Sequence, residues 1–387
     1  MRYRILVSVV LLAAQGAVSA AERDLSATVA QIIEGIPQPA HIAIGDLNGD
    51  GKPDLALGGI QDGKGRVLIL HQKGSKFAAP ADREIALPST PSGLVVADFD
   101  KDGKNDLAVG LRGKRRLSLY LGSENLGKEH PCDNVNDSAG GGLSWGRINK
   151  AGLADFVTGG VWRKWLGGDQ FQTGYFKGPE KNDNFTSRLE DMSGSGLDDV
   201  LFLTADNQVR IYYGPFLSIA LIEATEAMEV VTLKTPFSPG APYAELAIGD
   251  LNGDRQPDLV VFRQKTKDDP IRALVYLQNS PTGFTNGAGP SFALEGVAGP
   301  LVLADLNGDK LCDMAACQGD QRKLCVFFQK KGRPFASRAD DADDVLRLPD
   351  SAACVAAGDV DQDGVPNLIV GMRGGNLAIL RSLGSRP

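Results

Sequence analysis

The stretch GDLNGDGKPDLALGG, residues 45–59, decides how this sequence folds. It places oxygen-bearing side chains at positions 1, 3, 5 and 9 of a short loop, Asp46, Asn48, Asp50 and Asp54, and then becomes apolar. Carboxylates this close together repel one another unless a cation lies among them, which indicates a calcium loop. The alternative is an Asn/Asp/Gly turn that binds nothing. A single copy leaves both interpretations open.

The same pattern recurs along the chain. The clear copies are DLNGDGKPD from Asp46, DFDKDGKND from Asp98, DMSGSGLDD from Asp191, DLNGDRQPD from Asp250, DLNGDKLCD from Asp305 and DVDQDGVPN from Asp359. The gap after the second copy is filled by WGRINKAGLADFVTGG, residues 145–160, if Arg147 takes position 1 and Asp155 takes position 9. Starts at residues 46, 98, 147, 191, 250, 305 and 359 then define seven units of about 50 residues.

Each unit reads as four short strands. An apolar strand precedes the loop, as in HIAIGD, a second follows it, as in DLALGG, and a third follows a basic or polar tip, as in RVLILHQ. Several units place a Phe before a fourth strand, at Phe77, Phe284 and Phe335. Seven such units predict an all-β chain folded as a seven-bladed β-propeller. The last unit has room for three strands, so residues 27–34 are expected to complete it and close the ring.

The N-terminus predicts a secretory signal peptide over residues 1–20. A basic start, MRYR, leads into the apolar run ILVSVVLLAAQGAV and then the small residues Val18, Ser19 and Ala20. The next residue is Ala21 rather than a lipid-accepting Cys, and no apolar run long enough to span a membrane follows. We therefore expect a soluble exported protein, periplasmic, cell-surface or extracellular, with residues 21–387 forming one propeller domain.

Charge and cysteine content limit the partners and the disulfides. Without the predicted signal peptide the chain has 39 basic and 48 acidic residues, a net charge of −9, which argues against nucleic-acid binding. An odd number of cysteines leaves at least one unpaired. Cys317 and Cys325 flank a short turn and could pair across a hairpin, while other pairings stay open. The five cysteines are Cys132, Cys312, Cys317, Cys325 and Cys354.

Oxygen ligands at positions 1, 3, 5 and 9, with a backbone carbonyl at position 7, give Ca²⁺ the coordination it requires. A glycine at position 6 permits the sharp turn, although Arg255 and Lys310 replace it in the fifth and sixth loops. About five calcium sites are expected, and the second, with four carboxylates, should bind most strongly. The ligand sets are Asp46, Asn48, Asp50, Lys52 and Asp54; Asp98, Asp100, Asp102, Lys104 and Asp106; Asp250, Asn252, Asp254, Gln256 and Asp258; Asp305, Asn307, Asp309, Leu311 and Asp313; and Asp359, Asp361, Asp363, Val365 and Asn367.

The two remaining loops are poorer metal sites. The third has Arg147 and Ala151 at ligand positions and is predicted to have lost the metal. The fourth loop offers a weaker set that includes two hydroxyls: Asp191, Ser193, Ser195 and Asp199.

Taken together, the loops do not form EF-hands, because strands flank them and position 12 is not a Glu. Their recurrence at a fixed period favours calcium loops over metal-free turns.

The repeated motif carries a family resemblance. DxNGDGxxD between two strands, seven times, with a Phe before the fourth strand, resembles the FG-GAP/VCBS repeats of bacterial exported proteins and the propeller of integrin alpha subunits. The resemblance implies the fold and the metal but not one function, because such propellers serve adhesion, carbohydrate binding and occasionally polysaccharide cleavage. It also implies that the acidic loops, each joining the first and second strands of a blade, share one face.

The turns between second and third strands would then lie on the opposite face, and they are rich in Lys and Arg. Such a rim suits an anionic partner, although exposed hairpin tips are often charged for solubility alone. Two tryptophans in the third unit suit an acidic sugar beside these cations, or else pack between blades. For Trp145, which aligns with Ile44, packing is expected. The expected ligand-binding residues are Arg112, Lys114, Arg115, Arg116, Trp162, Arg163, Lys164 and Trp165.

These features favour a calcium-stabilised binding or adhesion module whose partner is a protein or an acidic glycan. The alternative is a lyase-like enzyme that acts on a polysaccharide through the same basic face. The sequence contains no GxSxG, HExxH or GxxxxGK[ST] motif and only three histidines, so no catalytic set is predicted.

Overall fold

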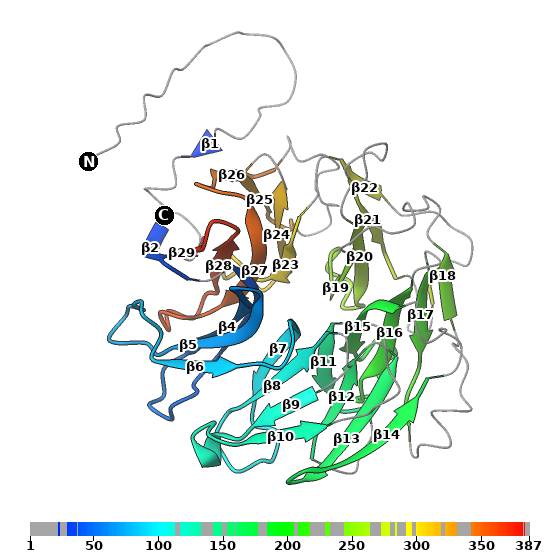
Figure 1. The fold of residues 1–387 in the computed structure, drawn as a ribbon. Coiled ribbons are helices and arrows are strands. Elements are labelled where there is room, and N and C mark those ends of the chain that lie inside the picture. Colours follow the sequence, from blue (N-terminus) through cyan, green and yellow to red (C-terminus); the bar gives the residue numbers. More distant parts are fainter. Residues whose placement is uncertain are drawn as a thin grey trace.

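The computed structural model describes most of the chain after the predicted signal peptide. Its strands form a ring of separate sheets, and the short 3-10 helix η2 (Gly122–Glu124) is the one helix among the described residues (Figure 1). The described residues are 22–23, 29–36, 38–112, 117–132, 142–148, 153–158, 160–176, 184–204, 208–216, 229–232, 244–263, 272–278, 283–284, 292–295, 299–318, 322–330, 342–381 and 383.

The ring contains seven blades, each built around four antiparallel strands, which follow chain order across the sheet except for the outer strand of blade seven. The chain is therefore an all-β seven-bladed propeller, as the repeats predict. The strand bounds are, for blade one, β3 (Pro39–Gly45), β4 (Asp54–Gln61), β5 (Lys64–Leu70) and β6 (Arg83–Ala86); for blade two, β7 (Pro91–Ala97), β8 (Asp106–Leu111), β9 (Leu117–Tyr120) and β10 (Glu129–Cys132); for blade three, β11 (Leu143–Gly146), β12 (Asp155–Thr158), β13 (Val161–Gly167) and β14 (Gln170–Tyr175); for blade four, β15 (Asn184–Glu190), β16 (Asp199–Thr204), β17 (Gln208–Tyr212) and β18 (Glu229–Thr232); for blade five, β19 (Ala244–Gly249), β20 (Asp258–Arg263), β21 (Arg272–Tyr276) and β22 (Phe292–Glu295); for blade six, β23 (Leu301–Ala304), β24 (Asp313–Gln318), β25 (Lys323–Phe327) and β26 (Asp344–Arg347); and for blade seven, β27 (Ala352–Gly358), β28 (Asn367–Met372), β29 (Asn376–Leu380) and β2 (Val29–Glu34).

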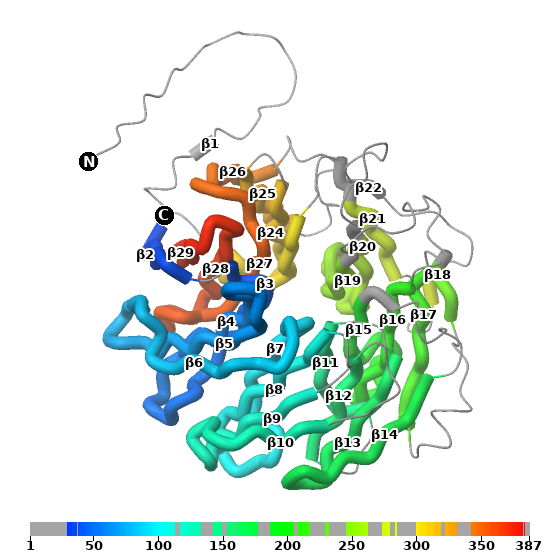
Figure 2. Tube along the Cα trace, viewed as in Figure 1, coloured from blue at the N-terminus to red at the C-terminus, as the bar shows by residue number. Residues whose placement is uncertain are grey.

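Burial explains why the strands of one blade differ in sequence. Every residue of β8, β16, β24 and β28 is buried, because second strands are covered on both sides by neighbouring blades, and these strands are continuous apolar runs. The outer strands β6 and β14 alternate between exposed and covered residues instead. The first strands contact one another in ring order, from β3 through β7, β11, β15, β19 and β23 to β27, and surround the axis (Figure 2).

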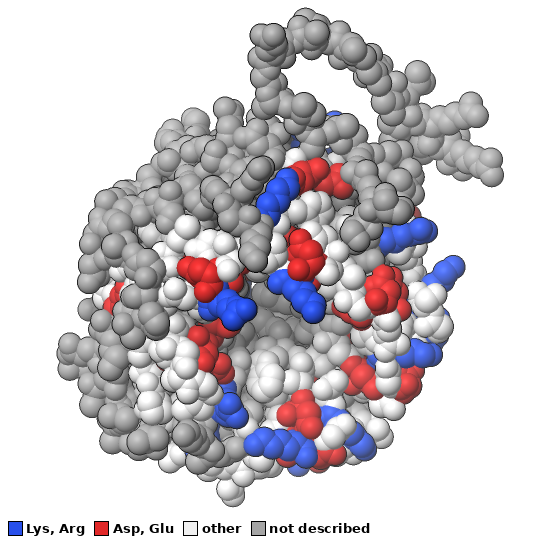
Figure 3. Space-filling model, turned by 180° about the vertical axis from the view of Figure 1, so that it is seen from behind, with Lys and Arg blue, Asp and Glu red and all other residues white. Residues whose placement is uncertain are grey.

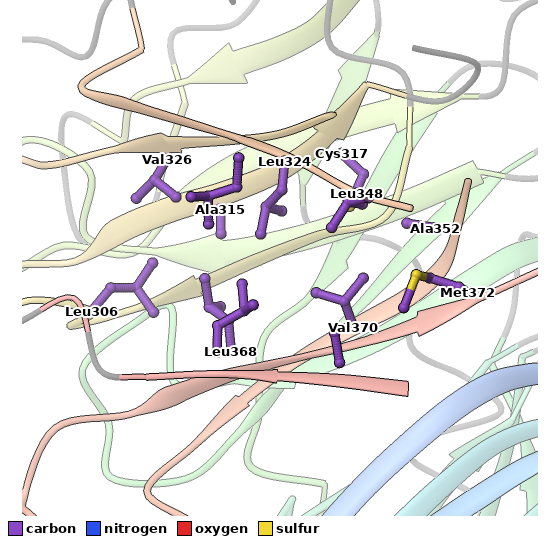
Figure 4. Close-up of a cluster of buried hydrophobic side chains, with 13 residues drawn as sticks. Leu306, Ala315, Cys317, Leu324, Val326, Leu348, Ala352, Leu368, Val370 and Met372 are labelled. Atoms are coloured by element: carbon purple, nitrogen blue, oxygen red, sulfur yellow. The ribbon is translucent and has the colours of Figure 1, made fainter. Parts of the chain in front are cut away.

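The core is divided among the interfaces between adjacent blades. Between blades six and seven, Ala315 and Leu324 face Leu368 and Val370, and all four side chains are buried (Figure 4). Burying an aliphatic side chain of this size contributes about 1.5–3 kcal/mol. Each blade therefore depends on its two neighbours for most of its stability.

The ring closes through the strand that the sequence places at residues 27–34. β2 pairs antiparallel with β29, with Ile33 opposite Leu377 and Glu34 opposite Asn376, so the seventh blade combines segments from early and late in the chain. This confirms the predicted closure. A two-residue strand, β1 (Glu22–Arg23), adds in parallel to the outer edge of blade six.

The acidic loops occupy equivalent places in all seven blades. The first strand ends one residue before position 1 and the second begins at position 9 in every blade. Gly146 pairs with Asp155 in blade three as Gly45 pairs with Asp54 in blade one, which confirms the register assigned to the third copy.

Two predictions from the sequence are wrong in local detail. Arg163 and Lys164 lie within β13 rather than at a hairpin tip, because β12 already ends at Thr158 and the chain turns before Val161. Cys317 pairs with Leu324 and Cys325 with Ala316, so the two thiols point to opposite faces of the sheet and cannot bond across the hairpin. None of the five cysteines is in a disulfide bond.

The Phe before the fourth strand is a core residue where the structure describes it. Phe77 and Phe284 are buried, and the backbone of Phe77 exchanges hydrogen bonds with the side chain of Gln31 in β2. Phe335 lies outside the described residues. No helix of the described chain has the length and apolar character needed to cross a membrane.

Candidate functional site

The carboxylate at position 1 organises each acidic loop by accepting backbone hydrogen bonds. In the first loop Asp46 Oδ1 accepts the N–H of Gly49 and Oδ2 accepts the N–H of Gly51, both at 2.7 Å. Asp46 also accepts the N–H of Asp50, and Asp250, Asp305 and Asp359 likewise accept the N–H groups at positions 5 and 6 of their own loops. The loop is therefore a tightly bonded turn held by the carboxylate at position 1.

Position 6 has a left-handed backbone in these loops. Gly51 has φ of +80°, and Arg255 and Lys310, which replace the glycine, have φ of +69° and +67°. A side chain in this region costs about 1 kcal/mol or more. The fifth and sixth loops thus keep the same geometry at some cost in strain.

The carboxylate at position 9 is buried and joins its loop to the end of the third strand. Asp54 Oδ2 accepts the N–H of Leu47, and Oδ1 accepts the N–H of Gln72, both at 2.9 Å. Asp106, Asp258 and Asp313 make the same two contacts in their blades. This residue supports the blade whether or not a metal binds.

Burial also makes these carboxylates difficult to ionise. It raises the pKa of Asp106 to about 6, of Asp258 to about 7 and of Asp313 to about 6, and neighbouring loop carboxylates raise them further while backbone N–H donors oppose the shift. Burial likewise raises the pKa of Asp100. A cation beside these groups would favour their charged forms.

Two loops bring three carboxylates within metal-binding distance. Oxygen atoms of Asp98, Asp100 and Asp106 lie within 4.8 Å of one another. The same holds for Asp359, Asp361 and Asp363 in the seventh loop. Ca²⁺ takes six to eight oxygen ligands at about 2.3–2.6 Å, so these donor sets suit it after a small contraction.

Among the described residues, the three carboxylates of the first, fifth and sixth loops do not come this close together. The amides of Asn252 and Asn307 each donate to the position 5 carboxylate of their loop at 3.1 Å, so in those two loops the position 3 and position 5 side chains bond each other directly. In the fourth loop Asp191 accepts the N–H groups of Ser195 and Gly196, and Asp199 accepts that of Ser193. The position 7 residues of the other five loops, Lys52, Lys104, Gln256, Leu311 and Val365, donate their N–H groups to the position 5 carboxylates.

The third loop is held by an indole and a guanidinium. Trp162 Nε1 donates to Asp155 Oδ1 at 2.9 Å, and Arg147 Nη2 donates to the Gly196 carbonyl of the neighbouring fourth loop at 3.0 Å. Ala151 lies outside the described residues. Trp162 therefore satisfies one oxygen of the position 9 carboxylate in this blade.

The expected aromatic ligand surface in blade three is contradicted by burial. Trp162 and Trp165 are 2% and 1% exposed, and Arg163 is fully buried and hydrogen-bonded to Thr158. A third strand is covered by neighbours on both sides, so both indoles enter the core, Trp162 beside Tyr212 and Trp165 beside Phe99 and Phe156. The packing alternative is correct for these two residues.

A cavity of about 710 Å³ lies on the axis of the ring, and all seven blades contribute to its wall. One lining residue per blade stands five positions before position 1 of the acidic loop, within the first three residues of the first strand or directly before it. This belt therefore lies at the end of the first strands remote from the acidic loops. Its members are His41, Gly93, Gly142, Thr186, Glu245, Pro300 and Cys354.

Two arginines add positive charge to the cavity. Arg112 is exposed and follows β8, and Arg188 projects from β15. Figure 3 shows a central hollow on one face of the molecule with basic and acidic side chains around it. Arg112 is thus the expected ligand residue that the structure places at a cavity, while residues 113–116, which include Lys114, Arg115 and Arg116, lie outside the described residues.

His41 is neutral in this setting. Burial lowers its pKa to about 4, the charges of Arg112 and Arg188 lower it further, and a hydrogen bond to the backbone of Pro91 opposes the shift. Among the described residues, the cavity wall therefore carries two guanidinium groups and the carboxylate of Glu245.

Trp145 also lines the cavity, which departs from the expected interior packing. It is 40% exposed and rests edge-on against Phe99, with ring centroids 5.2 Å apart. Sequence reasoning missed Arg188 as well. A signal was present, because the residue three positions before each acidic loop is Ala, Val or Ser in the other six blades: Ala43, Val95, Ser144, Ala247, Val302 and Ala356.

A family model described as an FG-GAP-like repeat matches residues 46–109, from the first acidic loop into the second strand of blade two. The remaining blades repeat the same strand order and loop register. The chain is a β-propeller of FG-GAP type. No curated protein matches this FG-GAP propeller.

Solved structures share its architecture. A chain of the BBS1N complex with ARL6DN, soaked with mercury, matches with a TM-score of 0.59 and 14% identity over 92% of this chain and 96% of that one. The WD40 domain of Toxoplasma gondii coronin gives 0.59 and 12% over 91% and 84%, and Chaetomium thermophilum Raptor gives 0.57 and 10% over 93% and 29%. At these identities the likeness shows the fold of the FG-GAP propeller alone.

Proposed function

We propose that this propeller is an exported, calcium-stabilised binding module whose partner is a protein or an acidic glycan. The observation that carries the proposal is the axial cavity, walled by all seven blades, with Arg112 at the end remote from the acidic loops. Propellers of this type are commonly binding modules, and a closed ring provides a rigid platform on which the two faces can take separate roles.

In this proposal the acidic loops hold calcium and support the architecture. The loops supply carboxylate, amide and carbonyl oxygens, which are the ligands that calcium prefers. The ligands belong to single turns tied to the ends of two strands, so a bound cation would fix each hairpin and favour the ionised form of the buried carboxylates. At tenfold excess over its dissociation constant, one site stabilises the fold by about 1.4 kcal/mol.

The partner proposal is tested by retention of the purified protein on immobilised acidic and neutral polysaccharides in the presence of calcium. Selective retention on an acidic polymer, reduced by Arg112→Gln, supports the binding module. Retention on neither polymer, together with no protein partner recovered from the exported fraction by cross-linking, would overturn it. Shortened or unsaturated products would instead support the lyase alternative.

The matched control is Arg373→Gln. Arg373 stands at the position of blade seven that Arg112 occupies in blade two, and each donates its backbone N–H across its own blade, to Ser351 and to Thr90. Arg373 does not line the cavity. Loss of retention in the Arg112 variant alone identifies the cavity rather than general surface charge.

A further inference from the structure

Arg188 is a charged residue at a structurally equivalent position that is small or apolar in every other blade. The fold therefore does not require charge there, and placing a guanidinium inside a channel costs solvation energy. It is 32% exposed and lies on the cavity wall. A residue that departs from its own repeat at a cost in solvation needs an explanation beyond folding.

The surroundings hold the Arg188 guanidinium in one place. Nη1 donates to Thr186 Oγ1 at 3.0 Å and to the Ser187 carbonyl at 2.8 Å, and Nη2 donates to Glu245 Oε1 of blade five at 3.4 Å. Gly142 of blade three lies against this group: a Cβ there would lie a tight 3.0 Å from Thr186 Oγ1 and at an ordinary contact distance of 3.7 Å from Nη1. Contacts with the described residues use three of the five N–H groups of the guanidinium, which leaves donors for a ligand.

Arg112 supplies a second cation to the same space. Both arginines act electrostatically on His41, so all three groups belong to one neighbourhood of the cavity. Two guanidinium groups against one carboxylate give the described part of this neighbourhood an excess of positive charge. Two guanidinium groups that share one site repel each other, and a bound carboxylate relieves that repulsion while accepting paired hydrogen bonds.

The rest of the wall has the character of a sugar site. The hydroxyls of Ser92 and Thr186 and the imidazole of His41 line the cavity at or beside the belt, and the partly exposed indole of Trp145 lies closer to the acidic-loop end of the first strands. Aromatic faces suit the C–H surfaces of a sugar ring, and short polar side chains suit its hydroxyls. A cavity of about 710 Å³ accommodates one or two sugar rings.

We propose that the axial cavity binds a sugar acid, with Arg188 and Arg112 holding its carboxylate and Trp145 packing against its ring. This inference rests on the proposed function, since it names the part of an acidic glycan that the binding module recognises. The ligand is a terminal or free uronic acid, because the cavity is enclosed by the first strands of the ring and receives the end of a chain more readily than its middle.

Titration calorimetry of the whole protein with galacturonic acid and glucuronic acid tests the proposal. Galactose, which lacks the carboxylate, and glutaric acid, which lacks the sugar ring, serve as comparison ligands. Binding of a uronic acid at least tenfold tighter than galactose or glutaric acid is expected. Arg188→Gln and Arg188→Lys should each weaken binding at least tenfold, because Lys keeps the charge but cannot form the paired contact. Trp145→Ala should weaken binding about fivefold or more, and Arg373→Gln should leave it unchanged.

The outcomes separate this inference from the proposed function. Retention on an acidic polymer that survives Arg188→Gln, with no binding of free uronic acids, overturns the cavity site and leaves the binding module standing. Equal binding of glutaric acid, or of a short Asp- and Glu-rich peptide, overturns the sugar acid as the ligand. Melting temperatures of the variants within about 3 °C of the parent show that a loss of binding is not a loss of folding.

Discussion

The buried carboxylate of Asp54 accepts the backbone N–H of Gln72 at 2.9 Å, and the side-chain amide of Gln72 in turn donates to the Val360 carbonyl of blade seven. The first acidic loop is thereby joined to its own third strand and to the next blade. Blade five repeats the arrangement, since Asp258 accepts the N–H of Gln278 and the Gln278 amide donates to Met192 of blade four at 3.0 Å. Position 9 thus acts as a junction between blades as well as a candidate metal ligand.

Asp54→Asn is expected to destabilise the protein even when calcium is chelated. The new amide nitrogen cannot accept a backbone N–H, so one buried donor loses its partner, at a cost of about 1–3 kcal/mol. The control is Asp50→Asn, at the exposed position 5, which should matter only when calcium is present. Urea denaturation in chelator and in calcium measures both variants. Equal stability of Asp54→Asn and the parent in chelator would contradict the structural role.

Chelation of calcium is expected to lower the melting temperature of the parent protein by several degrees. About five sites of the affinity typical of extracellular modules each contribute on the order of 1 kcal/mol at millimolar calcium. Calcium should restore the melting temperature and magnesium should not, because a loop rich in carboxylates with few waters suits the larger ion. An unchanged melting temperature in chelator, or full recovery with magnesium, would defeat the calcium proposal.

Ile33→Ala is expected to cost about 2–4 kcal/mol by weakening ring closure. Ile33 of β2 is 3% exposed and packs with Ile369 and Leu377 of blade seven. Its neighbour Ile32 is 47% exposed, and Ile32→Ala should change the free energy of unfolding by less than about 0.5 kcal/mol. Guanidinium unfolding of the two variants compares them directly, and equal effects would show that β2 does not seal the ring.

Acidification is expected to destabilise the folded protein partly through His41. Its folded pKa of about 4 lies below its ordinary value of 6.5, so the unfolded chain binds more protons between these values and stability falls as pH decreases through this window. His41→Gln removes the effect and should lose about 1–2 kcal/mol less than the parent between pH 7 and pH 4.5. Denaturation at the two pH values provides the measurement, and identical losses would refute the assignment.

The parts of the fold that follow from the sequence are those that recur in every blade. Asp155 was assignable to position 9 without a recognisable loop around it, because the strands on either side keep the repeat. Residues 27–34 were assignable to blade seven because the last unit lacks a strand and a ring tolerates no open edge.

The parts that do not follow are contacts between blades. Trp162 and Trp165 lie on opposite sides of β13, and both are buried because neighbouring blades cover both sides of that strand. Local sequence gives no sign of that double coverage. Arg188 and Glu245 meet from different blades, and nothing in either segment announces the partner. The candidate site is therefore formed only when the ring closes. From the sequence alone, it could have been suggested only by aligning the seven blades with one another.

The pairing of β2 with β29 has a consequence for how the molecule is made. Val29 and Leu380 are partners in one sheet, so the blade that holds them stays incomplete until residue 380 has left the ribosome. Six blades can assemble from neighbouring segments during synthesis, but the seventh cannot. A chain interrupted before residue 376 would leave β27 and β28 without their outer partners, and its strand edges would be open to other chains.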